Sequence, residues 1–322
     1  MCTAVSVSIG THFFGRNLDL EYTLGERVII TPQKYPFRFR CHKEINDHYA
    51  MIGMGIIQDG VPLYYEATNE KGLSAAALSF YEAQYMKERL GTDNIASFEL
   101  IPWVLCQCQN IDECRRLLMH INITDEPFSK SCPPSPLHWI VSDKKESVTV
   151  ECADGELKLF DNKAEMLTNS PSFPMQEFNL NNYMYLSSAA PGNRLSESLE
   201  LKLYSKGMGA LGLPGDMSSM SRFVRGFFVK EKLTAEDSYG KNVMQFFHLL
   251  EAVSMPKGTV KADGGKDEYT VYSCCCDTEK LIYYYRTYFD FSIRAVKLSD
   301  YKKTGSSLIT DEGKKIYGES MV

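Results

Sequence analysis

The sequence lacks several features that mark common classes of protein. Its 322 residues carry a net charge of −6, so there is no basic excess of the kind that binds nucleic acid. No apolar run approaches the ~20 residues needed to span a bilayer. The N-terminus shows neither the basic leader nor the apolar core of a secretory signal. We therefore expect a cytoplasmic protein that binds neither nucleic acid nor a membrane.

Internal repeats and low-complexity linkers are also missing. A length of 322 residues suits one large domain or two ordinary ones. Because no linker divides the chain, we expect one domain over residues 1–322, with a polar, peripheral tail from about residue 301 to residue 322.

Several kinds of catalytic or metal centre have no support. Gly-x-Ser-x-Gly and Gly-x-x-x-x-Gly-Lys are absent, which argues against a serine-esterase elbow and a phosphate loop. None of the six histidines forms a His-x-x-x-His pair, and His138, beside Trp139 in an apolar segment, suits a protein core. Among the ten cysteines, Cys106 and Cys108 have the wrong spacing for zinc, and 274–276 lie in a strand pattern. We expect buried free thiols, and no metal or cofactor.

Alternating apolar and polar residues predict many β-strands, with helices gathered between them. In the first half, strands are expected at 3–8, 12–14, 28–31, 50–57, 63–67 and 73–80. Helical spacing occurs at 97–107, 111–121, 218–227 and 241–253. Further strands are expected at 137–142, 147–152, 156–160, 268–275, 281–288 and 292–298. This arrangement predicts an α+β layered fold.

Cys2 is the residue that suggests a chemistry. If the preceding methionine is removed, Cys2 carries a thiol and a free α-amine on one residue. An ordinary α-amine titrates near 7.7–8.0 and a thiol near 8.5, so the amine can accept the thiol proton near neutral pH. By its position alone, Cys2 is better explained as an early strand residue, so the rest of the chain must decide.

Three polar clusters lie in turn-like or apolar surroundings. Arg16 and Asp19 lie three residues apart after a predicted strand, and Asn169 lies at the end of another. Gly212-Leu213-Pro214-Gly215-Asp216 leads into Ser221-Arg222-Phe223. Each cluster alone is explained by a surface ion pair, a turn or a helix cap.

Taken together, these clusters resemble the choloylglycine hydrolases, the family of bile salt hydrolases and penicillin V acylases, and most closely the bile salt hydrolases. The resemblance covers about residues 1–295 in family order and spacing. It implies a four-layer αββα sandwich of the N-terminal-nucleophile hydrolase type, with two antiparallel sheets between helical layers. The motifs are Met1-Cys2-Thr3, Phe14-Gly15-Arg16-Asn17-Leu18-Asp19, Asn69-Glu70-Lys71-Gly72-Leu73, Pro136-Leu137-His138-Trp139, Leu167-Thr168-Asn169-Ser170-Pro171, Gly212-Leu213-Pro214-Gly215-Asp216, Ser221-Arg222-Phe223 and Tyr283-Tyr284-Tyr285-Arg286-Thr287-Tyr288.

The resemblance also implies roles for five residues. Cys2 is the nucleophile, exposed by loss of the initiator methionine with no longer propeptide. Asp19 holds the α-ammonium, and Arg16 favours the thiolate electrostatically. Asn169 positions the reacting groups, and Arg222 adds positive charge near Cys2.

One position departs from the family pattern. Bile salt hydrolases typically have asparagine, and penicillin V acylases tyrosine, where this chain has Ser79 in Ala77-Leu78-Ser79-Phe80. The asparagine helps to form the oxyanion hole, and loss of one such donor can cost ~10²–10³ in rate. The serine hydroxyl, acting through a water, and the backbone N–H of Phe80 are the replacements that the sequence offers. We expect an active enzyme because the other five polar positions match.

The resemblance implies hydrolysis of the amide bond of a glycine- or taurine-conjugated bile salt, through a thioester, by a homotetramer from a gut-associated bacterium. A steroid needs a broad apolar wall. We expect Leu18, Leu20 and Leu137 to line it, with 56–58 nearby and the proline-rich loop 128–137 as a rim. Two alternatives remain, a penicillin V acylase-type amidase and a bile-salt-binding protein that has lost turnover through Ser79.

Overall fold

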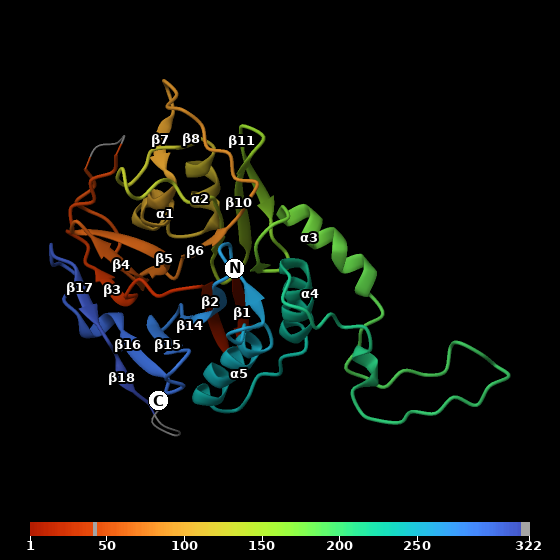
Figure 1. Ribbon diagram of the computed structural model, residues 1–322. Coiled ribbons are helices and arrows are strands. Elements are labelled where there is room, and N and C mark those ends of the chain that lie inside the picture. The colour runs from red at the N-terminus through yellow and green to blue at the C-terminus, as the bar shows by residue number, and fades with distance from the viewer. Residues whose placement is uncertain (41–43, 317–322) are drawn as a thin grey trace.

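The computed structural model describes residues 1–40 and 44–316 and contains two eight-stranded sheets lying face to face between helices (Figure 1). Within both sheets every pair of neighbouring strands is antiparallel. The αββα prediction is therefore confirmed.

The first sheet is built around the N-terminal hairpin. Its strand order is β12 (Met166–Leu167), β1 (Cys2–Ile9), β2 (Thr11–Leu20), β14 (Asp267–Asp277), β15 (Ile282–Thr287), β16 (Arg294–Lys297) and β18 (Lys314–Lys315), with β13 (Val260–Lys261) paired to β14. The second sheet has the order β11 (Glu156–Asp161), β10 (Ser147–Ala153), β9 (Leu137–Ser142), β6 (Ser74–Ser79), β5 (Val61–Asn69), β4 (Met51–Gln58), β3 (Arg27–Thr31) and β17 (Ile309–Asp311).

Helices cover the outer face of each sheet. On the first sheet these are α4 (Ser219–Lys230) and α5 (Tyr239–Glu251), with α3 (Phe173–Asn179) beside α4. On the second sheet α1 (Leu100–Gln107) packs against β5 and β6, with α2 (Ile111–Leu118) in the same apolar cluster. The remaining elements are the parallel pair β7 (Asp93–Ala96) and β8 (Ile121–Thr124), and the short 3-10 helices η1 (Ser97–Glu99), η2 (Leu180–Tyr183), η3 (Met208–Ala210) and η4 (Leu298–Asp300).

The alternation of side chains along each strand sends neighbouring residues into different apolar layers. In β6, Ala76 and Leu78 pack between the sheets, whereas Ala75 and Ala77 pack toward α1. This two-residue period is the one expected of a strand that is buried on both faces.

Three predictions about elements need correction, and two short strands were not predicted. The strand expected at 12–14 continues without a break as β2 to Leu20. Gly15 is not in a turn; the backbone of β14 lies so close to it that a Cβ there would collide with the carbonyl of Cys274. Helix α2 ends at Leu118, and Ile121 instead begins β8 in a parallel pair. The helix expected from residue 97 begins instead with the 3-10 turn η1, and α1 starts at Leu100. The polar tail after residue 300 also supplies β17 and β18 to the sheet edges, which the sequence does not predict, and 317–322 lie outside the described residues.

Residues 188–207 form an extended arm that leaves the body between η2 and η3 (Figure 1). At the base of the arm, the Ser187 N–H donates to the Gly209 carbonyl at 2.9 Å. Along the arm every side chain except that of Ser196 is exposed. Within the described part of the chain, no helix is both long and apolar enough to cross a membrane.

A buried histidine in the N-terminal hairpin makes stability depend on pH. His12 lies between Ser6 Oγ (2.8 Å from Nε2) and Thr278 Oγ1 (2.7 Å from Nδ1). Burial lowers the pKa of His12 to about 4 from an ordinary value near 6.5. Between those values the unfolded chain binds a proton that the folded chain does not, so stability falls as pH falls through this window.

We expect the wild-type chain to lose about 2 kcal/mol of unfolding free energy through His12 between pH 7 and pH 5. Urea unfolding at both pH values, compared between the parent and His12→Gln, measures this contribution. Replacing His248, which is exposed on α5, by glutamine is the matched control. Equal pH dependence in the parent and His12→Gln would contradict the assignment.

Candidate active site

Cys2 begins strand β1 and lines a cavity of about 340 Å³ whose other walls come from both sheets and from the loop before β9. The side chain is buried, and its register partner in β2 is Leu18. Most of the cavity wall is apolar; its residues include Leu20, Tyr22, Leu24, Ile56, Leu63, Ile101, Phe128, Pro133, Pro134, Pro136, Leu137 and Trp139.

Strand β2 sends Arg16 and Asp19 to opposite faces of the first sheet. Both are fully buried within the strand, so the interpretation as a surface ion pair in a loop is wrong. Arg16 faces the second sheet, where its Nη1 donates to the carbonyls of Tyr65 (2.9 Å) and Ala77 (2.6 Å). Because side chains alternate along a strand, Asp19 faces the α4 and α5 layer.

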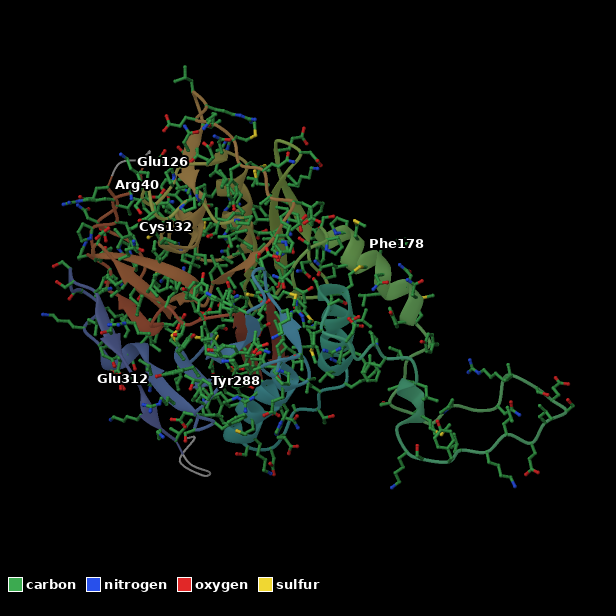
Figure 2. All side chains as sticks on the ribbon, in the orientation of Figure 1. Arg40, Glu126, Cys132, Phe178, Tyr288 and Glu312 are labelled. Carbon is green, nitrogen blue, oxygen red and sulfur yellow. The ribbon has the colours of Figure 1, made fainter. Side chains whose placement is uncertain are left out.

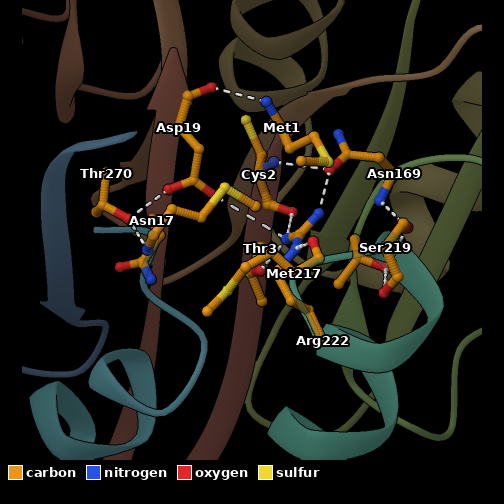
Figure 3. A network of polar contacts seen from close by, with 12 residues as sticks. Met1, Cys2, Thr3, Asn17, Asp19, Asn169, Met217, Ser219, Arg222 and Thr270 are labelled. Atoms are coloured by element: carbon orange, nitrogen blue, oxygen red, sulfur yellow. Dashed lines mark hydrogen bonds and ion pairs between the residues drawn. The ribbon is translucent and has the colours of Figure 1, made fainter. Parts of the chain in front are cut away.

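A network of short hydrogen bonds joins Cys2 to Asn169 and Arg222 (Figure 3). Asn169 Oδ1 accepts from the Cys2 backbone N–H and from Arg222 Nη2, both at 2.7 Å. Arg222 Nη1 also donates to the Cys2 carbonyl and to Thr3 Oγ1, both at 2.6 Å. The two donors to Oδ1 fix the orientation of the Asn169 amide, so its Nδ2 group points the other way.

Asp19 keeps one carboxylate oxygen without a hydrogen bond. Its Oδ1 accepts from Thr270 Oγ1 at 2.6 Å, while Oδ2 lies 4.0 Å from Arg222 Nη1 and has no hydrogen-bond partner within the described residues. Burial raises the pKa of Asp19, and the positive charge of Arg222 opposes that shift. The carboxylate is therefore held at a cost in free energy, as is common at functional sites.

Arg16 likewise keeps a buried Nη2 group that has no hydrogen-bond partner within residues 1–40 and 44–316. Its side chain lines the same cavity as Cys2. Burial alone lowers the pKa of Arg16, but Cys2, Tyr272 and Glu66 outweigh this effect, and the net pKa is raised. The guanidinium is thus a permanent positive charge beside the thiol.

Met1 precedes β1 and occupies part of the cavity wall. Its ammonium donates to the Asp19 carbonyl at 2.8 Å and pairs with Glu268, and the Asp19 N–H donates to the Met1 carbonyl at 2.9 Å. The nitrogen of Cys2 is therefore a peptide nitrogen here. Removal of Met1 would leave a free amine at that nitrogen, beside Asn169 Oδ1 and next to Asp19.

The structure corrects the expected source of a backbone donor near Ser79. The Phe80 N–H donates to the Pro136 carbonyl at 2.9 Å, so it is not available to a ligand. In an antiparallel ladder the backbone N–H and C=O groups of alternate residues point to opposite neighbouring strands, so those of Ser79 point away from β9. On that side the pairing of β6 with β5 ends at Ala76, and the Ser79 carbonyl accepts from Asn169 Nδ2 at 2.8 Å. The Ser79 N–H lies on this same side.

The three residues predicted to line the substrate pocket all lie in the wall of the cavity that contains Cys2. Leu18, Leu20 and Leu137 are among its wall residues, as are Ile56 and most of the proline-rich loop. Ile57 and Gln58 are not. Their role in binding remains a prediction.

Several residues that hold the site together carry no sequence signal. Thr270, on β14, reaches Asp19 because β14 pairs with β2. Ser219, the first residue of α4, accepts from the Asn169 N–H at 2.9 Å. Gln176 Nε2 donates to the Asn169 carbonyl. Only the topology brings these residues together.

The other cysteines, a metal site and His138 are the remaining candidates for a functional centre. The nine cysteines in the described residues are free thiols, and Cys41 lies outside them. No group of three or more His, Cys, Asp or Glu side chains in that part of the chain is placed to hold a metal ion. His138 is a core residue as predicted, with Nδ1 3.1 Å from Glu151 Oε1 and Nε2 2.8 Å from the Thr168 carbonyl.

Solved structures with the same arrangement include a variant of the conjugated bile acid hydrolase from Clostridium perfringens. It aligns with a TM-score of 0.89 at 33% identity, over 99% of this chain and 100% of that one. The penicillin V acylase from Agrobacterium tumefaciens shares the fold with a TM-score of 0.76 at 18% identity, over 97% and 91% of the two chains.

Sequence comparison gives the same relationship. The "Bile salt hydrolase/transferase" of Lactiplantibacillus plantarum is 47% identical over 300 residues, which cover 93% of each chain. A protein of the same name from Clostridium perfringens is 35% identical over 96% of each. Residues 2–311 match the family model described as "Linear amide C-N hydrolases, choloylglycine hydrolase family". This chain therefore belongs to the choloylglycine hydrolase family of linear amide C–N hydrolases.

Proposed function

We propose that the protein hydrolyses the amide bond of glycine- or taurine-conjugated bile salts, with Cys2 as its N-terminal nucleophile. The observation that carries this proposal is the position of Cys2. It lines a mostly apolar cavity and is joined to Asn169 and Arg222 by hydrogen bonds. The names of the relatives supply the substrate class.

In the proposed first step, the Cys2 thiolate attacks the amide carbonyl carbon to form a tetrahedral oxyanion. Collapse of the oxyanion breaks the C–N bond, and the Cys2 α-ammonium gives its proton to the departing nitrogen. Glycine or taurine leaves, and the bile acyl group remains as a thioester. Water, activated by the same amine, then hydrolyses the thioester and restores the thiol.

Two donors can stabilise the oxyanion. One is the Ser79 backbone N–H, which lies on the side of β6 away from β9, where pairing with β5 has already ended. The other is the second hydrogen of Asn169 Nδ2, whose first hydrogen is bound by the Ser79 carbonyl. Neither donor depends on the side chain at position 79, which supports an active enzyme despite the serine.

A substrate panel tests the proposal. Taurine- and glycine-conjugated bile salts and penicillin V are offered to protein whose intact mass shows that Met1 is absent, and release of the amine is measured. We expect release from the conjugated bile salts. Release from penicillin V alone would favour the acylase. If no substrate were cleaved but bile salts bound, the binding-protein alternative would stand.

The same substrate panel distinguishes the contribution of the backbone N–H at position 79 to catalysis from that of the side chain. We expect Ser79→Asn to change kcat by less than tenfold, well short of the ~10²–10³ associated with an oxyanion donor. The reason is that the backbone N–H is present in both variants. A hundredfold gain in Ser79→Asn would show that the parent lacks a donor.

We also propose that the protein forms a homotetramer through its arm. Exposed apolar side chains are concentrated on this segment; they are Leu195, Leu199, Leu201, Leu203 and Tyr204. In Figure 2 the arm as a whole stands clear of the rest of the chain. An apolar segment of this kind is typical of an interface with another chain. A groove between η2 and α4, at the foot of the arm, has a volume of about 450 Å³ and is lined by both apolar and charged side chains.

Shortening the arm is expected to dissociate the assembly. Replacing 192–205 by a short Gly-Ser loop keeps the Ser187–Gly209 base and removes the exposed leucines. Sedimentation should show a tetramer for the parent and a monomer or dimer for the shortened chain. Tyr81→Ser, which removes an exposed aromatic elsewhere, is the control. A tetrameric shortened chain would place the interface elsewhere.

A further inference from the structure

A buried carboxylate between the two sheets has no part in the reaction proposed above. Glu66 lies on β5 in the second sheet and is almost completely buried. Its Oε2 accepts from Tyr272 Oη at 2.7 Å, and its Oε1 accepts from Tyr283 Oη at 2.5 Å and from the Met54 N–H at 3.3 Å. Both tyrosines belong to the first sheet, so Glu66 reaches across the interior of the sandwich.

The same carboxylate faces the guanidinium that lines the active-site cavity. Glu66 Oε2 lies 3.7 Å from Arg16 Nε. Arg16 Nη1 is held by the Tyr65 and Ala77 carbonyls, which leaves Nη2 as the part without a partner within the described residues. One edge of the guanidinium is thus fixed by the second sheet, and the side chain lies beside Cys2.

Each element packed around this pair contributes polar groups. They are Cys2 on β1, Arg16 on β2, Tyr65 and Glu66 on β5, Tyr272 and Cys274 on β14, and Tyr283 on β15. Among them, Arg16 and Glu66 are the charged pair. Burial raises the pKa of Glu66; Arg16 and the two tyrosine hydroxyls favour the ionised form and offset part of that shift, so the net pKa remains raised.

We infer that Glu66 is a positioning residue for Arg16. Its carboxylate orients the guanidinium from the side away from the cavity and partly offsets its positive charge. Glu66 therefore sets how strongly Arg16 favours the Cys2 thiolate. This inference rests on the proposed role of Cys2 as the nucleophile. Tyr272 and Tyr283 serve the same purpose by holding the carboxylate. The substrate does not touch Glu66, since the side chain lies behind Arg16 and is not part of the cavity wall.

The inference predicts the sign of a shift in thiol reactivity. In Glu66→Gln the side chain keeps its shape, but the positive charge of Arg16 is no longer offset. The thiolate of Cys2 then becomes easier to form, and the pH midpoint of its alkylation falls by about one unit. We expect kcat for the bile salt substrate to fall about tenfold with little change in KM, because the orientation of Arg16 is loosened.

The experiment measures alkylation of the Cys2 peptide by iodoacetamide as a function of pH, using mass spectrometry and protein that lacks Met1. It needs no substrate, so it remains informative even if bile salts are not cleaved. Tyr272→Phe should shift the midpoint in the same direction by a smaller amount, and it serves if Glu66→Gln does not fold. Glu66→Asp, which keeps the charge, should restore most of the parental midpoint.

Asp277→Asn is the matched control, since it removes a buried carboxylate from the far end of the same strand as Tyr272. It should lower stability without moving the midpoint. An unchanged midpoint in both Glu66→Gln and Tyr272→Phe would reduce Glu66 to a structural residue. A rise in the midpoint would show that Glu66 does not offset Arg16, and either result overturns the inference.

Discussion

Cys2→Ala should abolish amide hydrolysis while leaving the fold intact. The expected loss in kcat is on the order of 10⁵-fold or more, because the reaction then has no nucleophile and only substrate positioning remains. The side chain is small and lies at a cavity, so stability should change by less than about 1 kcal/mol. Amine release from a conjugated bile salt, with thermal unfolding as the check on folding, measures both effects.

Cys132→Ala is the control for this prediction. Cys132 is a partly buried free thiol that lines the same cavity, on the proline-rich loop. If thiol chemistry belongs to Cys2 alone, Cys132→Ala should keep its activity within a few fold. Activity that survives Cys2→Ala but is lost in Cys132→Ala would move the nucleophile to the loop.

Asp19→Asn should have opposite effects on activity and stability. Activity is expected to fall by ~10²–10⁴, since the α-amine of Cys2 loses the carboxylate that holds its charged form. Stability at pH 7 is expected to rise by about 1 kcal/mol, because the charged Asp19 is buried with one oxygen unpartnered. Arg222 keeps its other acceptors, at Cys2, Thr3 and Asn169.

The pH dependence of this gain follows from the raised pKa of Asp19. Burial raises that pKa above its ordinary value of 3.8, so between the two values the folded chain binds a proton that the unfolded chain does not. The contribution of Asp19 to stability therefore falls as pH rises through that window. The advantage of Asp19→Asn should grow from pH 4 to pH 7 in urea unfolding.

Asp237→Asn, at an exposed site before α5, is the comparison. Its carboxylate bonds Lys241, so this variant should gain no stability and keep its activity. An Asp19→Asn variant less stable than the parent at pH 7 would show that Asp19 is stabilised by Arg222 more than it is destabilised by burial.

The sequence predicts the layers of this fold well because strands buried on both faces and amphipathic helices leave clear periodic patterns. The sequence predicts a strand over 137–142, and β9 occupies these same residues. The errors occur where contacts between residues far apart in the sequence determine the secondary structure. Ile121 pairs with Asp93 across a parallel ladder, and the tail adds strands to both sheets. Such pairings depend on segments far away in the chain.

The candidate site shows the same division. Its motif residues, Cys2, Asn169 and Arg222, could be found because they stand in recognisable order, and the structure brings them within hydrogen-bond distance. The partners of Asp19 and Arg16 could not, since Thr270 and Glu66 are ordinary strand residues that acquire their neighbours through sheet pairing and sheet packing.

Gly15 gives the site an unexpected dependence on strand register. Strand β2 presents Arg16 to the core between the sheets and Asp19 to the helical layer, so a slip of one residue against β1 would exchange the two faces. The close backbone approach of β14 at Gly15 leaves no room for a side chain, so a slip that put Phe14 or Arg16 at this point would bring its Cβ against the Cys274 carbonyl. Gly15 thus favours the register in which the positive Arg16, and not the negative Asp19, shares a face of the sheet with the Cys2 thiol.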